Sequence, residues 1–283
     1  IAFISQGLQG PEIFIYWTQT AKMARITQLP ESPSSLSWSN DGKQLAFSMF
    51  VPSAAPVIAQ IPKSTKGAKW AKKPRITDRL NHEADGRGYL PTGYSHLFVM
   101  SSEGGAIRQI SSGNYHHRGN LSWSKDNKAL YFSANRTPNW EYDFRNSEVY
   151  KISLQDGLIT PLTERDGPDY SPIVSPNGKM IAYLGFDDKR EAYQNHRLYL
   201  MDCDGENKRP ISQYLDASIS SIKWDADNKG IYFSFDHQGN GKIGYISLDG
   251  KVSKIADNQG GTTLGRPYSS GMFSISQNGK IAY

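Results

Sequence analysis

A short phrase recurs five times along the chain, and this repetition constrains the fold more than any other feature. One copy, LSWSNDGKQLAF at 36–47, reads as an alternating apolar and polar segment, a turn and a second alternating segment. Alternation with a period of two predicts β-strands. Asp-Gly or Asn-Gly between such strands predicts a two-residue hairpin turn in which both central residues have positive φ. The turns begin at Asp41, Asp126, Asn177, Asp227 and Asn278.

A second strand-turn-strand phrase alternates with the first. Its copies lie at 12–27, 96–111, 148–163, 197–212 and 242–256. Two hairpins per repeat give four strands in roughly 50 residues, which is the size of one blade of a β-propeller. A single four-stranded blade leaves both faces uncovered, so neighbouring blades are expected to stack around an axis.

The sequence therefore predicts an all-β fold, a β-propeller with four-stranded blades. Four blades are expected to be complete and two partial, cut from a ring of six to eight. We expect one domain over 1–283, with blades at 1–31 (partial), 32–111, 112–165, 166–213, 214–259 and 260–283 (partial). The first two turns are 85 residues apart, against 50 or 51 for later pairs, which predicts an insertion, placed at 50–95. The chain lacks an initiator Met, so we expect a piece of a longer protein.

Charge and composition narrow the partners. The net charge is +5, and the densest basic run, 63–75, lies among prolines and reads as an exposed loop, so no nucleic-acid partner is expected. A single cysteine, Cys203, excludes an intrachain disulfide. No apolar run approaches the roughly 18 residues that a membrane span requires.

The search for catalytic and metal-binding patterns finds none that is complete. A nucleophilic serine in the G-x-S-x-G pattern is absent, and the one Gly pair at that spacing, Gly261 and Gly265, flanks Thr263. No histidine forms a His-x-x-x-His pair or a Cys/His cluster. We therefore expect no catalytic residue, no metal and no cofactor in this segment. A serine triad from distant residues and a metal held by several loop histidines remain open alternatives.

One loop combines aromatic and charged residues. It lies within 133–150, between the second and third strands of the blade at 112–165, and holds Trp140, Glu141, Tyr142, Asp143 and Arg145. Aromatic rings beside carboxylates can hold a cationic group such as a peptide amino terminus. The alternative is a loop that pins itself to its neighbour.

Three segments carry a resemblance to a known family. RITDRLNHEADGRGYLPTGYSHLFVM (75–100), SANRTPNWEYDFRNSEVY (133–150) and GGTTLGRPYSSGMFSIS (260–276), together with the hairpins, resemble the propeller of acylaminoacyl-peptidase-like and dipeptidyl-peptidase-like members of the prolyl oligopeptidase family of serine peptidases. The resemblance implies a following α/β-hydrolase domain that bears the Ser, Asp and His. No position here matches that triad. Activity is therefore expected of the full-length peptidase and not of this segment alone.

The resemblance also implies a role and a set of residues. The propeller would cap the hydrolase active site and restrict access to short peptides. The residues expected to contact substrate are Arg87, Tyr89, Tyr94 and His96 in and beside the insertion, and Trp140, Glu141 and Asp143 in the loop. The expected partners are peptide substrates and a C-terminal hydrolase domain beyond 283, with a homo-oligomer left open. Family habit favours a periplasmic or secreted location over a cytoplasmic one.

Two other functions stay open. A propeller of the Tol-system type, which shares the hairpin phrase, would dock a protein partner in its funnel. A metal-dependent propeller lyase would act on acidic sugars with histidine-held metal.

Overall fold

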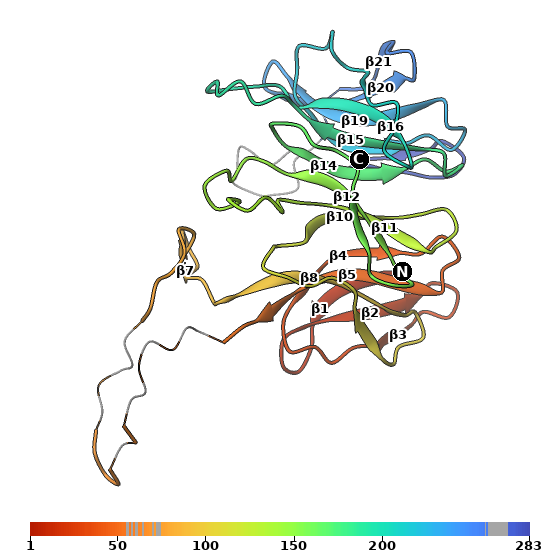
Figure 1. The fold of residues 1–283 in the computed structure, drawn as a ribbon. Helices are drawn as coiled ribbons and strands as arrows, with labels where there is room; N and C mark the ends of the chain where they lie inside the picture. Colours follow the sequence, from red (N-terminus) through yellow and green to blue (C-terminus); the bar gives the residue numbers. More distant parts are fainter. Residues whose placement is uncertain are drawn as a thin grey trace.

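The strands form antiparallel sheets that follow one another in chain order, from the red N-terminal sheet to the blue sheet in Figure 1. The computed structural model describes residues 1–54, 57, 59, 62–63, 65–69, 71, 75–257, 259 and 271–283. The first sheet has three strands: β1 (Ala2–Gln6), β2 (Pro11–Trp17) and β3 (Lys22–Arg25).

Four four-stranded sheets follow. The first contains β4 (Pro33–Trp38), β5 (Gln44–Pro52), β8 (Gly93–Ser101) and β9 (Ile107–Gln109). The second contains β10 (Arg118–Trp123), β11 (Ala129–Ala134), β12 (Glu148–Ser153) and β13 (Ile159–Pro161). The third contains β14 (Asp169–Val174), β15 (Met180–Gly185), β16 (Arg197–Asp202) and β17 (Arg209–Pro210). The fourth contains β18 (Ile219–Trp224), β19 (Gly230–His237), β20 (Asn240–Ser247) and β21 (Val252–Ala256).

A two-stranded sheet of β22 (Ser274–Ile275) and β23 (Ile281–Ala282) ends the described chain. No helix occurs among the described residues, and the prediction of an all-β propeller is confirmed. The number of blades in a complete ring and the domain bounds remain predictions. In the described part of the chain, no helix has the length and apolar character needed to cross a bilayer.

The cores lie between neighbouring sheets. Ala46 and Leu97 from one sheet pack with Leu130 and Phe132 from the next. A second cluster joins the sheets of β14–β17 and β18–β21 in the same way. Fully burying such a side chain contributes roughly 1.5–3 kcal/mol, and this burial stabilises the stack that a single blade could not form.

The first strands of neighbouring sheets are also tied by hydrogen bonds. The indole nitrogen of Trp123 donates to the Ser37 carbonyl at 3.3 Å, and that of Trp224 donates to the Ile173 carbonyl at 3.0 Å. The Val174 amide donates to the Ser122 hydroxyl at 2.9 Å. These bonds fix the relative position of adjacent blades.

The expected two-residue turns with two positive φ angles are wrong. The amide of Ser39 donates to Gln44 O at 3.0 Å, so the loop contains the four residues between them. Within it Gly42 has a φ of 69°, whereas Asp41 is not left-handed. The Asp41 carboxylate instead accepts from the Ser39 hydroxyl at 2.7 Å and from the Lys43 amide at 3.1 Å. These bonds stabilise a longer turn in which only one residue is left-handed. In the corresponding turns of two later sheets, Asn127 and Asn228 take the place of Gly42, with φ of 59° and 60°.

A hydroxyl-to-backbone bond repeats in four sheets. A Thr or Ser hydroxyl that follows the last strand of the sheet accepts from an amide of the strand before it, at 2.9 Å each time: Thr27 from Ile13, Ser111 from Leu97, Thr163 from Val149 and Ser212 from Leu198. The residue immediately before that amide differs between sheets, being Glu12, His96, Glu148 or Arg197. We call this bond the hydroxyl tie.

One edge of the molecule, which we call the loop edge, collects the longer connections. It contains the β11–β12 loop (135–147), the β15–β16 loop (186–196) and the sheet-to-sheet connections at 110–117, 162–168 and 211–218. The insertion also opens here.

The insertion leaves the sheet between β5 and β8. Because Pro52 pairs with Gly93, it runs between 53 and 92 rather than over 50–95. It carries a small hairpin, β6 (Glu83–Ala84) and β7 (Gly88–Tyr89), which stands outside the sheets in Figure 1. Lys63, Lys66 and Lys69 of the basic run are exposed. Lys72, Lys73 and most of 260–276, including Gly261, Thr263 and Gly265, lie outside the described residues.

Candidate functional site

A cavity of about 280 Å³ lies at the loop edge, between the insertion and the β11–β12 loop. Its lining residues are Asp78, Arg79, Tyr94, Pro138, Asn139, Trp140, Glu141 and Tyr142. Three of the seven expected substrate-binding residues, Tyr94, Trp140 and Glu141, therefore meet here although they come from different segments.

An aromatic cluster forms one wall of this cavity. The ring centroids of Tyr94 and Trp140 are 6.3 Å apart, and His116 from the 110–117 connection lies 5.2 Å from Tyr94 and 5.7 Å from Trp140. The Arg79 guanidinium lies over the Tyr94 ring at 4.5 Å from its centroid. Edge-to-face contacts of this kind hold the rings in fixed orientations, so the wall can receive a ligand without rearranging.

Glu141 contributes the carboxylate of the cavity. Its Oε2 accepts a hydrogen bond from the Leu80 amide at 3.4 Å, which ties the insertion to the β11–β12 loop. Its Oε1 is buried and has no hydrogen-bond partner among the described residues. A buried acceptor without a donor is costly, so this oxygen offers an acceptor to an N–H or ammonium group of a ligand.

The other four expected residues lie elsewhere. The Asp143 carboxylate lies 4.0 Å from the Arg190 guanidinium of the next sheet, a contact that fits the alternative in which this loop holds itself to its neighbour. Arg87 and Tyr89 lie on the exposed β6–β7 hairpin, where Arg75 lies over the Tyr89 ring. His96 is buried at 6% exposure. Their roles in substrate binding stay predictions.

His96 belongs to a buried histidine pair. Its Nδ1 lies 3.3 Å from Nδ1 of His117, and Nη1 of Arg136 donates to His117 Nε2 at 2.6 Å. Burial, with the charge of Arg136, lowers the pKa of His117 to about 3, and burial also lowers the pKa of His96. Both rings are therefore neutral at pH 7. No group of three or more His, Cys, Asp or Glu suited to a metal ion occurs in the part of the chain that the structure describes.

Sequence reasoning missed three arginines beside this cavity. Nη2 of Arg118 donates to His116 Nδ1 at 2.7 Å, Arg79 Nη1 donates to the Gly93 carbonyl at 3.3 Å, and Arg136 holds His117. We call Arg79, Arg118 and Arg136 the open arginine cluster. The adjacent His116-His117 pair, directly before a strand, was the one sequence signal that could have pointed to it.

Three further arginines lie at the same loop edge, and we call Arg145, Arg165 and Arg190 the paired arginine cluster. Arg165 pairs with Asp169 and, at 3.4 Å, with Asp187. Arg190 lies 3.4 Å from Asp166 and 3.7 Å from Asp188, and Arg145 lies 3.9 Å from Asp188.

Two buried carboxylates lie near Arg165, and Asp169 is the one that forms an ion pair with it. Asp169 is 1% exposed, and Glu148, whose Oε2 accepts from the Thr163 hydroxyl, is 7% exposed. Burial raises the pKa of Glu148 to about 7 and that of Asp169 to about 6, and the Arg165 charge opposes both shifts. One guanidinium cannot neutralise two carboxylates, so this site favours the uptake of a proton.

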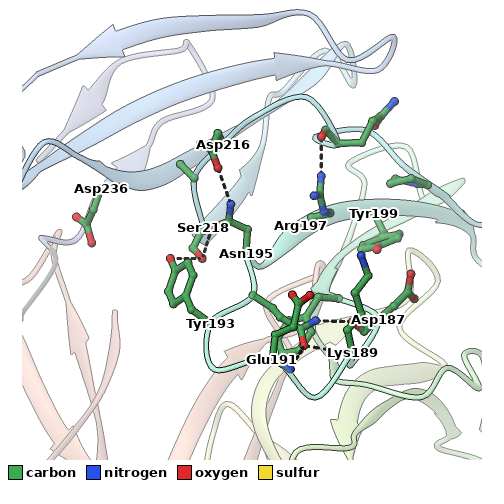
Figure 2. Close-up of a pocket in the computed structure, with 15 residues that line it drawn as sticks. Asp187, Lys189, Glu191, Tyr193, Asn195, Arg197, Tyr199, Asp216, Ser218 and Asp236 are labelled. Atoms are coloured by element: carbon green, nitrogen blue, oxygen red, sulfur yellow. Dashed lines mark hydrogen bonds between the residues drawn. The ribbon is translucent and has the colours of Figure 1, made fainter.

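A larger, polar cavity of about 690 Å³ lies beside the β15–β16 loop. Figure 2 shows Tyr193, Ser218, Asn195 and Asp216 joined in one hydrogen-bonded chain there, with contacts of 3.1 to 3.3 Å. Asp187 and Tyr199, both partners of Arg165, also line it. No sequence pattern pointed to this cavity, because its residues are ordinary loop residues.

The comparisons with known proteins match the segment that builds the smaller cavity. Residues 69–189 match the family model described as the dipeptidyl peptidase IV N-terminal region. Dipeptidyl-peptidase 5 of Porphyromonas gingivalis is 28% identical over 144 residues, and the match covers 49% of this chain and 21% of that protein. The peptidase YuxL of Bacillus subtilis is 25% identical over 274 residues, covering 90% of this chain and 40% of that protein.

In sequence this propeller is similar to the N-terminal regions of peptidases. Its fold agrees with that of the β-propeller domain of the Trilobed protease from Pyrococcus furiosus, at a TM-score of 0.57 and 17% identity over 92% of this chain and 66% of that one. It also agrees with the acylaminoacyl peptidase of Pyrococcus horikoshii, at a TM-score of 0.65 and 17% identity over 90% and 36%. The propeller domain thus spans less than half the length of the relatives that it matches in sequence.

The two alternative functions also have structural neighbours. TolB from Acinetobacter baumannii superposes at a TM-score of 0.55 and 16% identity over 89% of this chain and 49% of that one. An oligogalacturonate lyase in complex with manganese superposes at 0.64 and 12% identity over 99% and 65%. At these identities the likeness concerns the fold alone. The match to the peptidase family in sequence favours the peptidase relationship.

Proposed function

We propose that this propeller domain covers the active site of a serine peptidase and admits short peptides while it excludes folded chains. The catalytic Ser, Asp and His belong, in this proposal, to an α/β-hydrolase domain that is the propeller's partner. The domain itself performs no hydrolysis and contributes part of the wall of the substrate chamber.

One observation carries the proposal. The segment that matches the peptidase N-terminal region, 69–189, contains every residue that lines the 280 Å³ cavity. The part of the chain that is most peptidase-like is therefore also the part that forms an aromatic pocket with a carboxylate. Aromatic side chains combined with placed polar groups, as Trp140 and Glu141 are here, are typical of small-ligand sites.

The physical effect of such a cover is exclusion by size. Propeller sheets packed through continuous cores, such as the clusters around Phe132 and Phe233, cannot open without exposing buried apolar surface. A stiff cover admits a flexible peptide and rejects a folded domain, and it also shields the reacting groups from bulk water.

The test uses the full-length protein and one cleavable sequence in three contexts: a free short peptide, an unfolded long polypeptide and an exposed loop of a folded protein. We expect cleavage of the short peptide and little or none of the folded-protein loop, measured as initial rates. Comparable rates on the short peptide and the folded loop would contradict the proposal.

A variant then links the cavity to the substrate. Trp140→Ala is expected to raise KM for the short peptide by removing part of the aromatic wall. Leu158→Ala serves as the control, because Leu158 is 64% exposed at the opposite edge of the same sheet. Equal KM values for the two variants would show that the cavity does not contact the peptide.

A further inference from the structure

The open arginine cluster has no internal counter-charge. In the part of the chain that the structure describes, no Asp or Glu oxygen lies within 4.0 Å of a side-chain nitrogen of Arg79, Arg118 or Arg136. The residues outside the described ranges include no Asp or Glu, so this absence of an ion pair holds for every carboxylate side chain of the sequence. Arg145, Arg165 and Arg190, on the same edge, each face at least one Asp.

Neutral acceptors hold the guanidiniums in place of carboxylates. Arg118 and Arg136 donate to the imidazoles of His116 and His117, which must be uncharged to accept. Burial and the nearby arginine charges lower the pKa of His116 to about 4, which keeps its ring uncharged at pH 7. Each guanidinium has five N–H donors. Arg118 and Arg136 each use one donor on a histidine, and Arg79 uses one on the Gly93 carbonyl. The cluster keeps its full charge and most of its donors.

Aromatic rings set the orientation of the guanidiniums. Arg79 lies over Tyr94 at 4.5 Å, and Arg136 lies over Tyr115 at 4.9 Å. Through Tyr94 and His116 the cluster is continuous with the aromatic wall of the 280 Å³ cavity. Burial and the charge of Arg87 on the insertion hairpin lower the pKa of Arg118, which shows that a further cation lies nearby.

We propose that the open arginine cluster binds the carboxylate of a short peptide. A planar carboxylate matches the donor fork of a guanidinium in a bidentate pair and would supply the counter-charge that the cluster lacks. This proposal rests on the proposed function, which brings short peptides to the cavity. The carboxylate can be the peptide's C-terminus or an acidic side chain, and the experiment separates these sources.

The experiment measures KM of the full-length protein for three peptides of one sequence: a free C-terminus, a C-terminal amide, and the amide with one Glu added. We expect KM to be about tenfold lower for the free acid than for the amide, because charge-assisted hydrogen bonds are lost with the amide. If the added Glu restores the low KM, the cluster also accepts a side-chain carboxylate; if it does not, the cluster binds the C-terminal carboxylate alone.

Arg118→Gln is expected to raise KM for the acidic peptide toward that of the amide. Arg190→Gln, from the paired arginine cluster, should preserve the difference between the two peptides. Without peptide, Arg118→Gln should melt at or above the temperature of the unmodified protein, because it removes a repelling charge. This readout separates ligand binding from a structural role.

The outcomes distinguish the two proposals. If peptides are cleaved but KM is the same for acid, amide and Glu-containing amide, the carboxylate site is wrong and the proposed function stands. If no peptide is cleaved, the proposed function fails, and calorimetric binding of the same peptides to the same variants decides the carboxylate site. Binding that does not distinguish acid from amide, or a preference that survives Arg118→Gln, overturns it.

Discussion

Two clusters of three arginines lie on the same edge of the molecule and differ in one respect. In the paired arginine cluster, Arg145, Arg165 and Arg190 each face an aspartate, whereas the arginines of the open cluster face neutral imidazoles, a carbonyl and aromatic rings. The chain places acids in the segment 162–188 and none in 111–125, next to His116 and Arg118. The charges of the first cluster are thus paired within the protein, and the second keeps its charge and most of its donors for a ligand.

The largest expected effect breaks the paired arginine cluster at its buried member. Arg165→Met removes the cation that faces Asp169, whose side chain is 1% exposed, and should lower the free energy of unfolding by about 3–5 kcal/mol because a buried carboxylate is left without its partner. Asp187→Asn is the matched control, because Asp187 is 73% exposed and should cost about 1 kcal/mol or less. Urea denaturation at pH 8 measures both. Equal losses would show that burial does not decide the strength of these pairs.

The second effect concerns pH. The pKa of Glu148 is raised from 4.5 to about 7, so the folded state keeps a proton that the unfolded state releases, and stability should fall as pH rises from about 4.5 to 7. The expected loss is roughly 2–3 kcal/mol for a shift of this size. Glu148→Gln should remove this part of the pH dependence and be the more stable protein at pH 8. If the stability of Glu148→Gln depends on pH between 4 and 8 in the same way as that of the unmodified protein, Glu148 is excluded as the source of this dependence.

The third effect turns to the open arginine cluster. Arg136→Met leaves Nε2 of the fully buried His117 without its donor, and a buried unsatisfied group of this kind costs about 1–3 kcal/mol. Loss of the neighbouring positive charge should also raise the pKa of His117, although burial continues to hold it below its ordinary value. Denaturation and an NMR titration of the His117 ring measure the two consequences. A His117 pKa that does not move would mean that Arg136 exerts no charge effect there.

The smallest effect is expected at the exposed end of the paired arginine cluster. Arg190 is 65% exposed, so Arg190→Gln should cost about 1 kcal/mol or less. The loss should shrink further in high salt because exposed charges are screened. A loss that persists at high salt would show that Arg190 acts through packing rather than through its charge.

The strands and their grouping were predictable because the signal is local. The alternation of Leu121 and Trp123, for example, matches the buried positions of β10, whereas the apolar residues of β11 are buried on both faces of the sheet. The turn geometry was missed because the carboxylate of Asp41 supplies hydrogen bonds that a rule on φ angles does not include.

The candidate site was only partly predictable. Tyr94, Trp140 and Glu141 were found because their segments carry the family resemblance. The destination of Asp143 could not be inferred, because its contact with Arg190 joins residues 47 positions apart in the sequence. Arg79 and Arg118 were missed for the same reason, since their common neighbourhood exists only when the insertion folds back against the 110–117 connection.

The hydroxyl tie has a consequence for how a propeller can acquire new chemistry. Because a Thr or Ser hydroxyl binds a backbone amide of the penultimate strand, this bond does not depend on which side chain stands just before that amide, and in two sheets that side chain, Glu12 or Glu148, itself accepts from the same hydroxyl. Glu12, His96, Glu148 and Arg197 occupy that place in successive sheets with an acid, an imidazole, an acid and a base. Equivalent positions in successive sheets thus carry different titratable or charged side chains, while the backbone bond beside each of them stays the same.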